Sequence, residues 1–189
     1  MTTKTNTEAA TPRFSKDSWL RAAMEALAKE GQARLKVDEI AKNLGVTKGS
    51  FYHHFKNRED FVESILDFWA DSFTEYVIQT IGNLEASASD KLLELMRLVE
   101  REGLDRYDIA FRSWAAQDPK VAEVVQKVDV ARHRFITTLF KEMGFKEPEL
   151  SMRVKIWLVY ASAQRTIRFP GKGETDELIV QRHRFFTEA

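Results

Sequence analysis

Residues 45–60 read GVTKGSFYHHFKNRED, and this stretch decides how the rest of the chain is interpreted. It opens with a Gly–Val pair and then carries three aromatic residues and two adjacent histidines. From Lys42 to Arg58 there are four Lys and Arg residues and no acidic residue. A chain whose formal net charge is zero therefore concentrates positive charge on one short segment, which favours a local contact with phosphate.

Two short helices are predicted on either side of Gly45, one over 37–44 and one over about 48–55, with Thr47 able to cap the second. Gly45 can adopt the positive φ that a tight turn between them requires. A short helix, a tight turn and a second short helix form a helix-turn-helix. The apolar residues that define the inner faces are Val37, Ile40, Ala41, Leu44, Val46, Phe51 and Phe55.

The outer face of the second helix carries the candidate nucleic-acid contacts, because the N-terminal end of a recognition helix enters the major groove of DNA. A lysine there can donate to guanine O6 and N7, and a glycine allows close approach of the backbone. Basic residues just beyond the helix can follow the phosphates, together with the amide groups that begin the next helix. The candidates are Thr47, Lys48, Gly49, Ser50, Tyr52, His53, Lys56 and Arg58.

Other interpretations of the same residues remain open at this point. A helix-turn-helix can serve only for packing, and Tyr52 alone fits a half-buried core position. His53 and His54 could suggest a metal site, but neighbours on a helix point about 100° apart, so one ion cannot easily take both. The segment GVTKGS lacks the spacing of a phosphate-binding loop. We therefore expect no metal and no cofactor.

The remainder of the chain is predicted to be helical, which gives an all-α fold. Residues 1–12 are polar, lack periodicity and are expected to form a disordered tail. A helix capped by Ser15 ends at Gly31, and Asn57 caps a long helix that runs to about Ile81 with apolar residues on more than one side. Further helices are expected at about 90–101, 104–116, 119–142, 149–168 and 174–188.

The segment VDEIAKNLGVTKGSFYHHFKNREDFVESIL (37–66), preceded by ALAKEG (26–31), resembles the tetracycline-repressor (TetR) family of bacterial transcription regulators. The close resemblance covers about residues 14–66. It implies a homodimer in which residues 13–58 bind a palindromic operator, while residues 59–189 enclose a small-molecule pocket and form the dimer interface. Val37 departs from the Thr or Ser that the family often has there to bind phosphate, and Lys36 is the candidate substitute.

The C-terminal half carries features of a dimer. Along 149–168, one apolar stripe contains Leu150, Val154 and Trp157, and a second contains Met152, Ile156 and Val159, so one stripe requires a partner. With the helix at 174–188, this predicts a four-helix interface between two copies. Both stripes could instead belong to the core of one chain.

A pocket for a mostly apolar ligand is expected among the aromatic residues of the same half, although most aromatics at helical spacing are simply core. Arg112 and His133 stand out because polar groups inside an apolar bundle need partners. The candidate lining residues are Trp69, Phe73, Tyr107, Phe111, Trp114, His133 and Gln164.

Composition narrows the classes of function. The chain has no cysteine, which excludes disulfides and thiolate chemistry, and its longest apolar run is too short to span a bilayer. The N-terminus has no apolar segment typical of a signal peptide, so a soluble, cytoplasmic protein is expected. The absence of a G-x-S-x-G or H-E-x-x-H motif argues against an enzyme.

These observations predict a dimeric DNA-binding regulator, a repressor that a small ligand releases from its operator. The open alternatives are an activator, and a protein of the same fold that organises chromosomes or binds a protein partner without any ligand.

Overall fold

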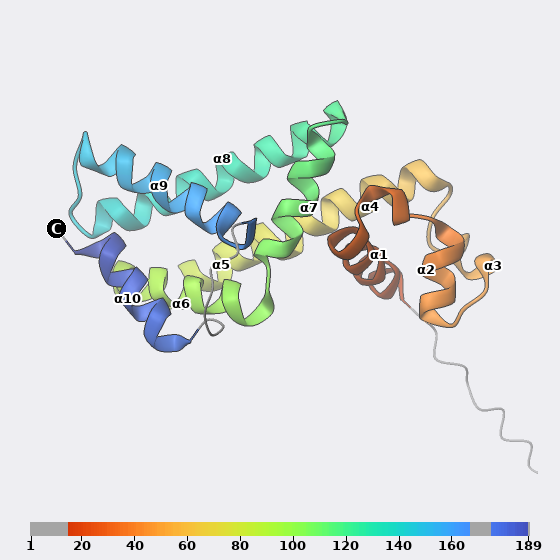
Figure 1. Cartoon of the computed structure of the whole chain (residues 1–189), viewed down its shortest axis with the longest axis horizontal. Coiled ribbons are helices and arrows are strands. Elements are labelled where there is room, and N and C mark those ends of the chain that lie inside the picture. The colour runs from red at the N-terminus through yellow and green to blue at the C-terminus, as the bar shows by residue number, and fades with distance from the viewer. Residues whose placement is uncertain (1–14, 167–174, 189) are drawn as a thin grey trace, which may run out of the picture.

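The computed structural model describes residues 15–166 and 175–188, and every regular element in those two ranges is helical (Figure 1). The predicted all-α fold is confirmed. The predicted tail at 1–12 and the segment 167–174 lie outside the described residues. The elements are α1 (Lys16–Glu30), η1 (Gln32–Arg34), α2 (Val37–Leu44), α3 (Lys48–Phe51), α4 (Arg58–Ala70), η2 (Asp71–Glu75), α5 (Tyr76–Gly82), α6 (Ala88–Glu102), α7 (Asp105–Ala115), α8 (Pro119–Glu142), α9 (Glu149–Ala163), η3 (Gln164–Thr166) and α10 (Asp176–Thr187).

The helix boundaries of the N-terminal region follow its local chemistry. The Ser15 side chain accepts the Ser18 N–H at 3.2 Å and begins α1, and the Asn57 side chain accepts the Asp60 N–H at 2.9 Å and begins α4. Gly45 closes α2 in the left-handed conformation with φ 69°. These three signals were readable from the sequence.

Two helices differ from their predicted extent. The predicted helix at about 48–55 ends at Phe51, because tighter i to i−3 bonds from His53 and His54 turn the chain and bring Phe55 back into the core. The long helix that starts at Arg58 is interrupted by η2, a π-helical segment, before it continues as α5.

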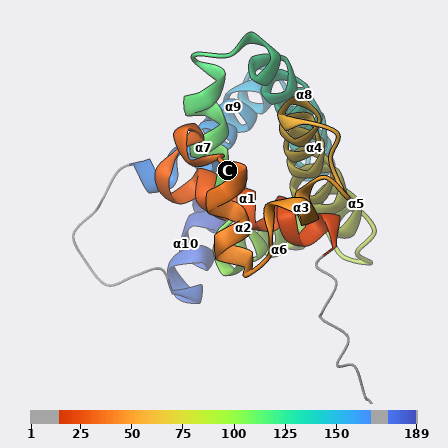
Figure 2. The same cartoon turned by 90° about the vertical axis from the view of Figure 1, so that its right-hand side faces the viewer.

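The molecule is elongated, with the two ends built from different parts of the chain (Figure 1). Helices α1, α2 and α3 form one end, and α10 lies at the other with one end of α8 and of α9. The continuous run of α4, η2 and α5 passes from the first end toward the second. Figure 2 views the same structure from the end that carries α2 and α3.

The buried apolar residues form two clusters that meet near η2. The first cluster joins α1–α4 to α7 and to the beginning of α8, where it includes Val121 and Val125. The second joins α5, α6, α9 and α10 to the end of α8, where it includes Ile136 and Phe140. The core of the N-terminal helices therefore extends past residue 58 into the C-terminal half.

Four aromatic residues hold α3 against α1 and α4. Trp19, Phe51, Phe55 and Phe61 are each at most 1% exposed. The Phe51 ring lies 5.5 Å from that of Trp19 and 5.3 Å from that of Phe61, with edge-to-face geometry in both pairs. Because α3 has only four residues, this packing rather than helix propensity holds it in place.

We predict that Phe51→Ala lowers the free energy of unfolding by about 3–5 kcal/mol, because it opens a cavity at the centre of this cluster. Tyr52→Ala is the matched control: its side chain is 61% exposed, although its ring touches that of Phe51 at 5.2 Å. The control should cost about 1 kcal/mol. Urea unfolding followed by circular dichroism measures both, and equal losses would contradict this account of α3.

Candidate nucleic-acid interface and internal cavity

The residues predicted to face nucleic acid lie mainly on α3 and the turn that follows it (Figure 2). The structure leaves all of them accessible: Ser50 is half-buried and the rest are exposed. Phe51 and Phe55 point inward, as the spacing predicted. The accessible residues are Lys36, Thr47, Lys48, Gly49, Ser50, Tyr52, His53, Lys56 and Arg58.

Lys48 has a partner that the sequence reasoning missed. Its Nζ lies 3.1 Å from Oδ1 of Asp38, on α2, and this hydrogen-bonded ion pair raises the pKa of Lys48. Both side chains are more than half exposed, so the pair is weak and exchangeable. Asp38 lies ten positions earlier in the chain, and only the crossing of α2 over α3 brings the two together.

Lys36 and the start of α4 are also engaged in local contacts. The Lys36 Nζ lies 3.3 Å from Glu39, and this contact is the main cause of the lowered pKa of Glu39. At the start of α4, the Asp60 amide already donates to Asn57, and the Lys56 amide donates to Asp60 at 2.7 Å. These two amides are therefore used internally, and not all the amide groups expected for phosphate remain available.

Gly49 has no packing role that would require glycine. A Cβ at this position would meet only the Thr47 Oγ1, at 3.5 Å, which is an ordinary contact. Its φ lies outside the left-handed region, where the structure marks only other glycines. The backbone at Gly49 is instead open to solvent at the beginning of α3. Because the fold does not require glycine at position 49, its presence is consistent with close approach of another molecule to the backbone there.

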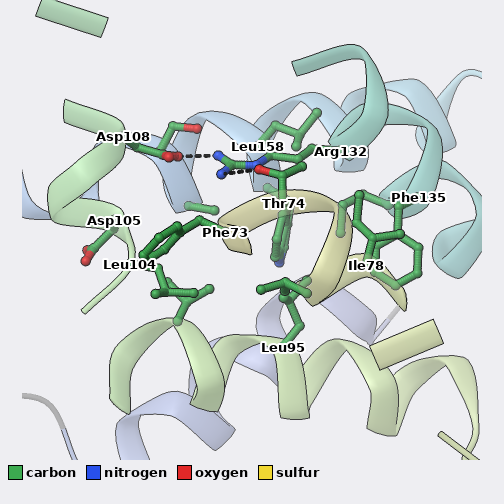
Figure 3. Close-up of a pocket in the computed structure, with 16 residues that line it drawn as sticks. Phe73, Thr74, Ile78, Leu95, Leu104, Asp105, Asp108, Arg132, Phe135 and Leu158 are labelled. Atoms are coloured by element: carbon green, nitrogen blue, oxygen red, sulfur yellow. Dashed lines mark hydrogen bonds and ion pairs between the residues drawn. The ribbon is translucent and has the colours of Figure 1, made fainter. Parts of the chain in front are cut away.

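A second candidate site is an internal cavity of about 60 Å³ in the C-terminal half (Figure 3). Its wall is mostly apolar and comes from η2, α5, α6, α7, α8 and α9. The lining residues are Phe73, Thr74, Val77, Ile78, Leu95, Val99, Leu104, Asp105, Asp108, Arg132, Phe135, Ile136, Trp157, Leu158, Ala161 and Ser162. Pockets for drug-sized ligands usually have about 300–1,000 Å³, so a ligand of that size requires side chains to move.

One part of the cavity wall is a buried polar cluster (Figure 3). Arg132 on α8 donates through Nη1 to the Asp108 carboxylate on α7, and through Nη2 to the Thr74 hydroxyl at 3.0 Å. Thr74 is 2% exposed and belongs to the π-helical segment η2. Segments of this kind are frequent at functional sites because they widen one turn of a helix. The cluster therefore links the cavity to the long helix that begins beside α3.

The structure gathers few of the residues predicted to line a ligand pocket. Phe73 lines the cavity, and Trp69, Phe111 and Trp114 are stacked in the first apolar cluster, with Trp69 and Phe111 centroids 4.2 Å apart. The other three lie elsewhere. Tyr107 donates to Glu25, Gln164 donates to Asp105, and His133 is exposed on α8 beside a groove that Arg112 and Asp129 also line.

Arg112, which the sequence marked as a polar residue in need of a partner, forms an ion pair with Asp129. Its Nη2 lies 2.5 Å from Oδ1 of Asp129, and the hydrogen bond raises the pKa of the guanidinium. Sequence reasoning missed most of the cavity wall, including the polar cluster of Thr74, Asp108 and Arg132. Charge at positions that helical periodicity turns inward was the only signal for Asp108 and Arg132, and Thr74 gave none.

Comparison with known proteins agrees with the N-terminal assignment. Residues 20–65 match the model of the bacterial regulatory proteins of the tetR family. The transcriptional regulator AcuR of Cereibacter sphaeroides is 33% identical over 90 residues, which cover 48% of this chain and 41% of AcuR. The HTH-type transcriptional repressor KstR2 of Mycolicibacterium smegmatis is 36% identical over 85 residues, 44% of this chain and 40% of KstR2. The chain thus matches less than half the length of these relatives.

The likeness of the fold extends over the whole molecule. The crystal structure of AibR in complex with isovaleryl coenzyme A and operator DNA superposes with a TM-score of 0.69 at 19% identity, covering 91% of this chain and 97% of AibR. Fold and surface together define a helix-turn-helix protein with a larger all-helical C-terminal part. In sequence, residues 20–65 are similar to the TetR family of bacterial regulators.

We predict that Gly49→Ala reduces affinity for duplex DNA at least about tenfold while leaving the melting temperature within about 2 °C of the original. The methyl group fits the folded chain and favours helix, but it would occupy the surface to which we expect DNA to bind closely. Fluorescence anisotropy measures the affinity and scanning calorimetry the stability. Unchanged DNA affinity would show that the backbone of α3 does not approach DNA closely.

Proposed function

We propose that this protein is a homodimeric, DNA-binding transcriptional regulator, a repressor that a small, mostly apolar ligand releases from a palindromic operator. Residues 13–58 act as the DNA-binding domain and residues 59–189 as the ligand-binding and dimerisation domain. The observation that carries the proposal is the exposed polar face of α3, which four buried aromatic rings hold in place from behind. The name of KstR2 as a repressor favours repression over activation.

The roles of the α3 residues follow from their positions. Lys48 is proposed to leave Asp38 and donate to a base edge, with Gly49 allowing the approach. Thr47, Ser50, Tyr52 and His53 contact phosphates or bases beside it. Lys36, Lys56 and Arg58 neutralise phosphate charge along the backbone.

Dimerisation is supported by an apolar stripe along α9 that none of the residues in 15–166 and 175–188 covers. Met152, Ile156 and Val159 are 58%, 47% and 61% exposed, whereas Leu150 and Val154 on the same helix are buried. On α10, Leu178 and Phe185 are also exposed, at 44% and 77%. We propose that a second copy covers this surface and so sets the spacing of two α3 helices, about 34–36 Å for successive major grooves.

The route from ligand to DNA is proposed to run through η2. Phe73 and Thr74 lie in the cavity wall, and the same helical run continues without a break into α4, which packs on α1 and begins two residues after Lys56. A ligand that enlarges the cavity would move η2 and, with it, the end of α4 that supports α3. The ligand must bind the DNA-free arrangement more tightly, since otherwise it shifts nothing.

A ligand-free role in chromosome organisation or protein binding is the second candidate. The buried polar cluster in an otherwise apolar cavity favours the ligand-responsive role over the ligand-free one. Buried polar groups destabilise a fold unless they are hydrogen-bonded, and a ligand could supply the missing partners.

The DNA-binding proposal is tested by comparing Lys48→Ala with Lys56→Ala in gel-shift titrations against the operator and a scrambled duplex. Lys48→Ala should lose about 1–3 kcal/mol on the operator alone, because it removes a base contact. Lys56→Ala should weaken both duplexes and lower the salt slope by about one. Equal losses on both duplexes for Lys48→Ala would refute its base-reading role.

The dimer is tested by Val159→Glu, which places a charge in the middle of the proposed interface. We expect the dimer dissociation constant to rise at least about a hundredfold, because an unpaired buried carboxylate costs several kcal/mol. Thr80→Glu, at an exposed position of α5, is the matched control and should remain dimeric. Analytical ultracentrifugation reads both, and a dimer unchanged by Val159→Glu would rule out the α9 stripe.

A further inference from the structure

The buried carboxylates of the cavity wall are not equally satisfied. Asp105 is 2% exposed, and its oxygens accept from Arg165 at 2.6 and 2.7 Å and from Gln164 at 3.1 Å. Asp108 is 4% exposed, and only its Oδ2 has a partner, Arg132. Within the described part of the chain, the Oδ1 of Asp108 is buried and accepts no hydrogen bond. Asp108 therefore has one acceptor to spare at the cavity.

The cation beside this acceptor is already committed. Arg132 donates to Asp108 and to Thr74, and its guanidinium lies 5.8 Å from the Trp69 ring centroid. A carboxylate ligand would either place a second negative charge beside a pair that is already neutral or displace Asp108 and leave its buried charge without compensation. An ammonium ligand would bring a second cation next to Arg132. The neutral pair therefore disfavours ligand heads of either charge.

The same cavity wall also contains a buried hydrogen-bond donor without an acceptor among the described residues. The indole Nε1 of Trp157, which lines the cavity from α9, is buried and has no hydrogen-bond acceptor among the residues the structure describes. A buried donor and a buried acceptor that both lack partners are costly in the empty protein. A ligand that supplies the missing groups recovers that cost on binding.

We infer that the cavity takes an uncharged, mostly apolar ligand whose hydroxyl or amide N–H donates to the Oδ1 of Asp108. This assignment rests on the proposed function, since it names the ligand class of the same regulatory site. The apolar part of the ligand lies among Leu95, Val99 and Phe135, and Asp108 sets the specificity for the head. A site built to satisfy a polar group rejects analogues that lack it strongly, because its buried groups then stay unpaired.

The test compares four probes with the same six-carbon chain: 1-hexanol, hexanamide, hexanoate and hexylammonium. Isothermal titration calorimetry on the full-length protein without DNA measures the four affinities. We expect 1-hexanol and hexanamide to bind at least about tenfold more tightly than hexanoate and hexylammonium. Hexanoate or hexylammonium binding as tightly as the neutral probes, or no binding by any probe, would overturn the inference.

Asp108→Asn tests the residue itself. The amide no longer neutralises Arg132, so hexanoate should gain at least about tenfold and the order of the probes should change. Asp176→Asn is the matched control, because it removes the carboxylate partner of Arg97, and neither residue lines the cavity, so the order should stay unchanged. An unchanged order in Asp108→Asn would exclude Asp108 as the selecting group.

The outcome is independent of the test of DNA binding. A protein that binds its operator in gel shifts but does not rank the probes as stated would overturn the ligand class and leave the regulator intact. A protein that ranks the probes as stated but does not bind DNA would support the ligand class and overturn the proposed regulator.

Discussion

The packing of Trp69 against Phe111 is the contact on which the arrangement of this molecule depends. Trp69 comes from α4 and Phe111 from α7, and their rings lie nearly parallel, 4.2 Å apart and almost completely buried. Through this pair, one apolar cluster continues from the aromatic rings behind α3 to α7 and the beginning of α8. Close-packed interiors transmit displacement because they have little free volume. The exposed face of α3 is thus mechanically continuous with the helices that enclose the cavity.

The sequence predicted the N-terminal part best because there the signals are local. Caps such as Ser15 and Asn57, the turn at Gly45 and the inward pair Phe51 and Phe55 each depend on residues within a few positions. The buried and exposed stripes of α9 were also readable from periodicity. The dimer that they suggest stays a prediction, as do the roles of the residues on α3.

The cavity could not be predicted in the same way, because its residues meet only through packing at long range. Thr74, Asp108 and Arg132 come from three separate elements, and charge on the inward side of a helix does not show which residues Asp108 and Arg132 meet. The aromatic residues that attracted attention, such as Trp69 and Trp114, lie in the first apolar cluster, and their contact with a ligand stays a prediction. The π-helical turn was equally invisible, since the periodic pattern of an uninterrupted helix fits residues 58–81 well.

The ion pair between Lys48 and Asp38 bears on how the proposed regulator would distinguish its operator from other DNA sequences. If Lys48 reads a base as proposed, Asp38 on the neighbouring helix competes with every acceptor on the duplex for its ammonium group. On a sequence without a suitable base at that step, Lys48 would stay paired with Asp38, and the Asp38 carboxylate would repel the nearby phosphates. Only a base acceptor in the correct register would compensate for the lost ion pair. Such an internal competitor would weaken binding to random sequence more than to the operator, and would raise specificity without an additional contact to DNA.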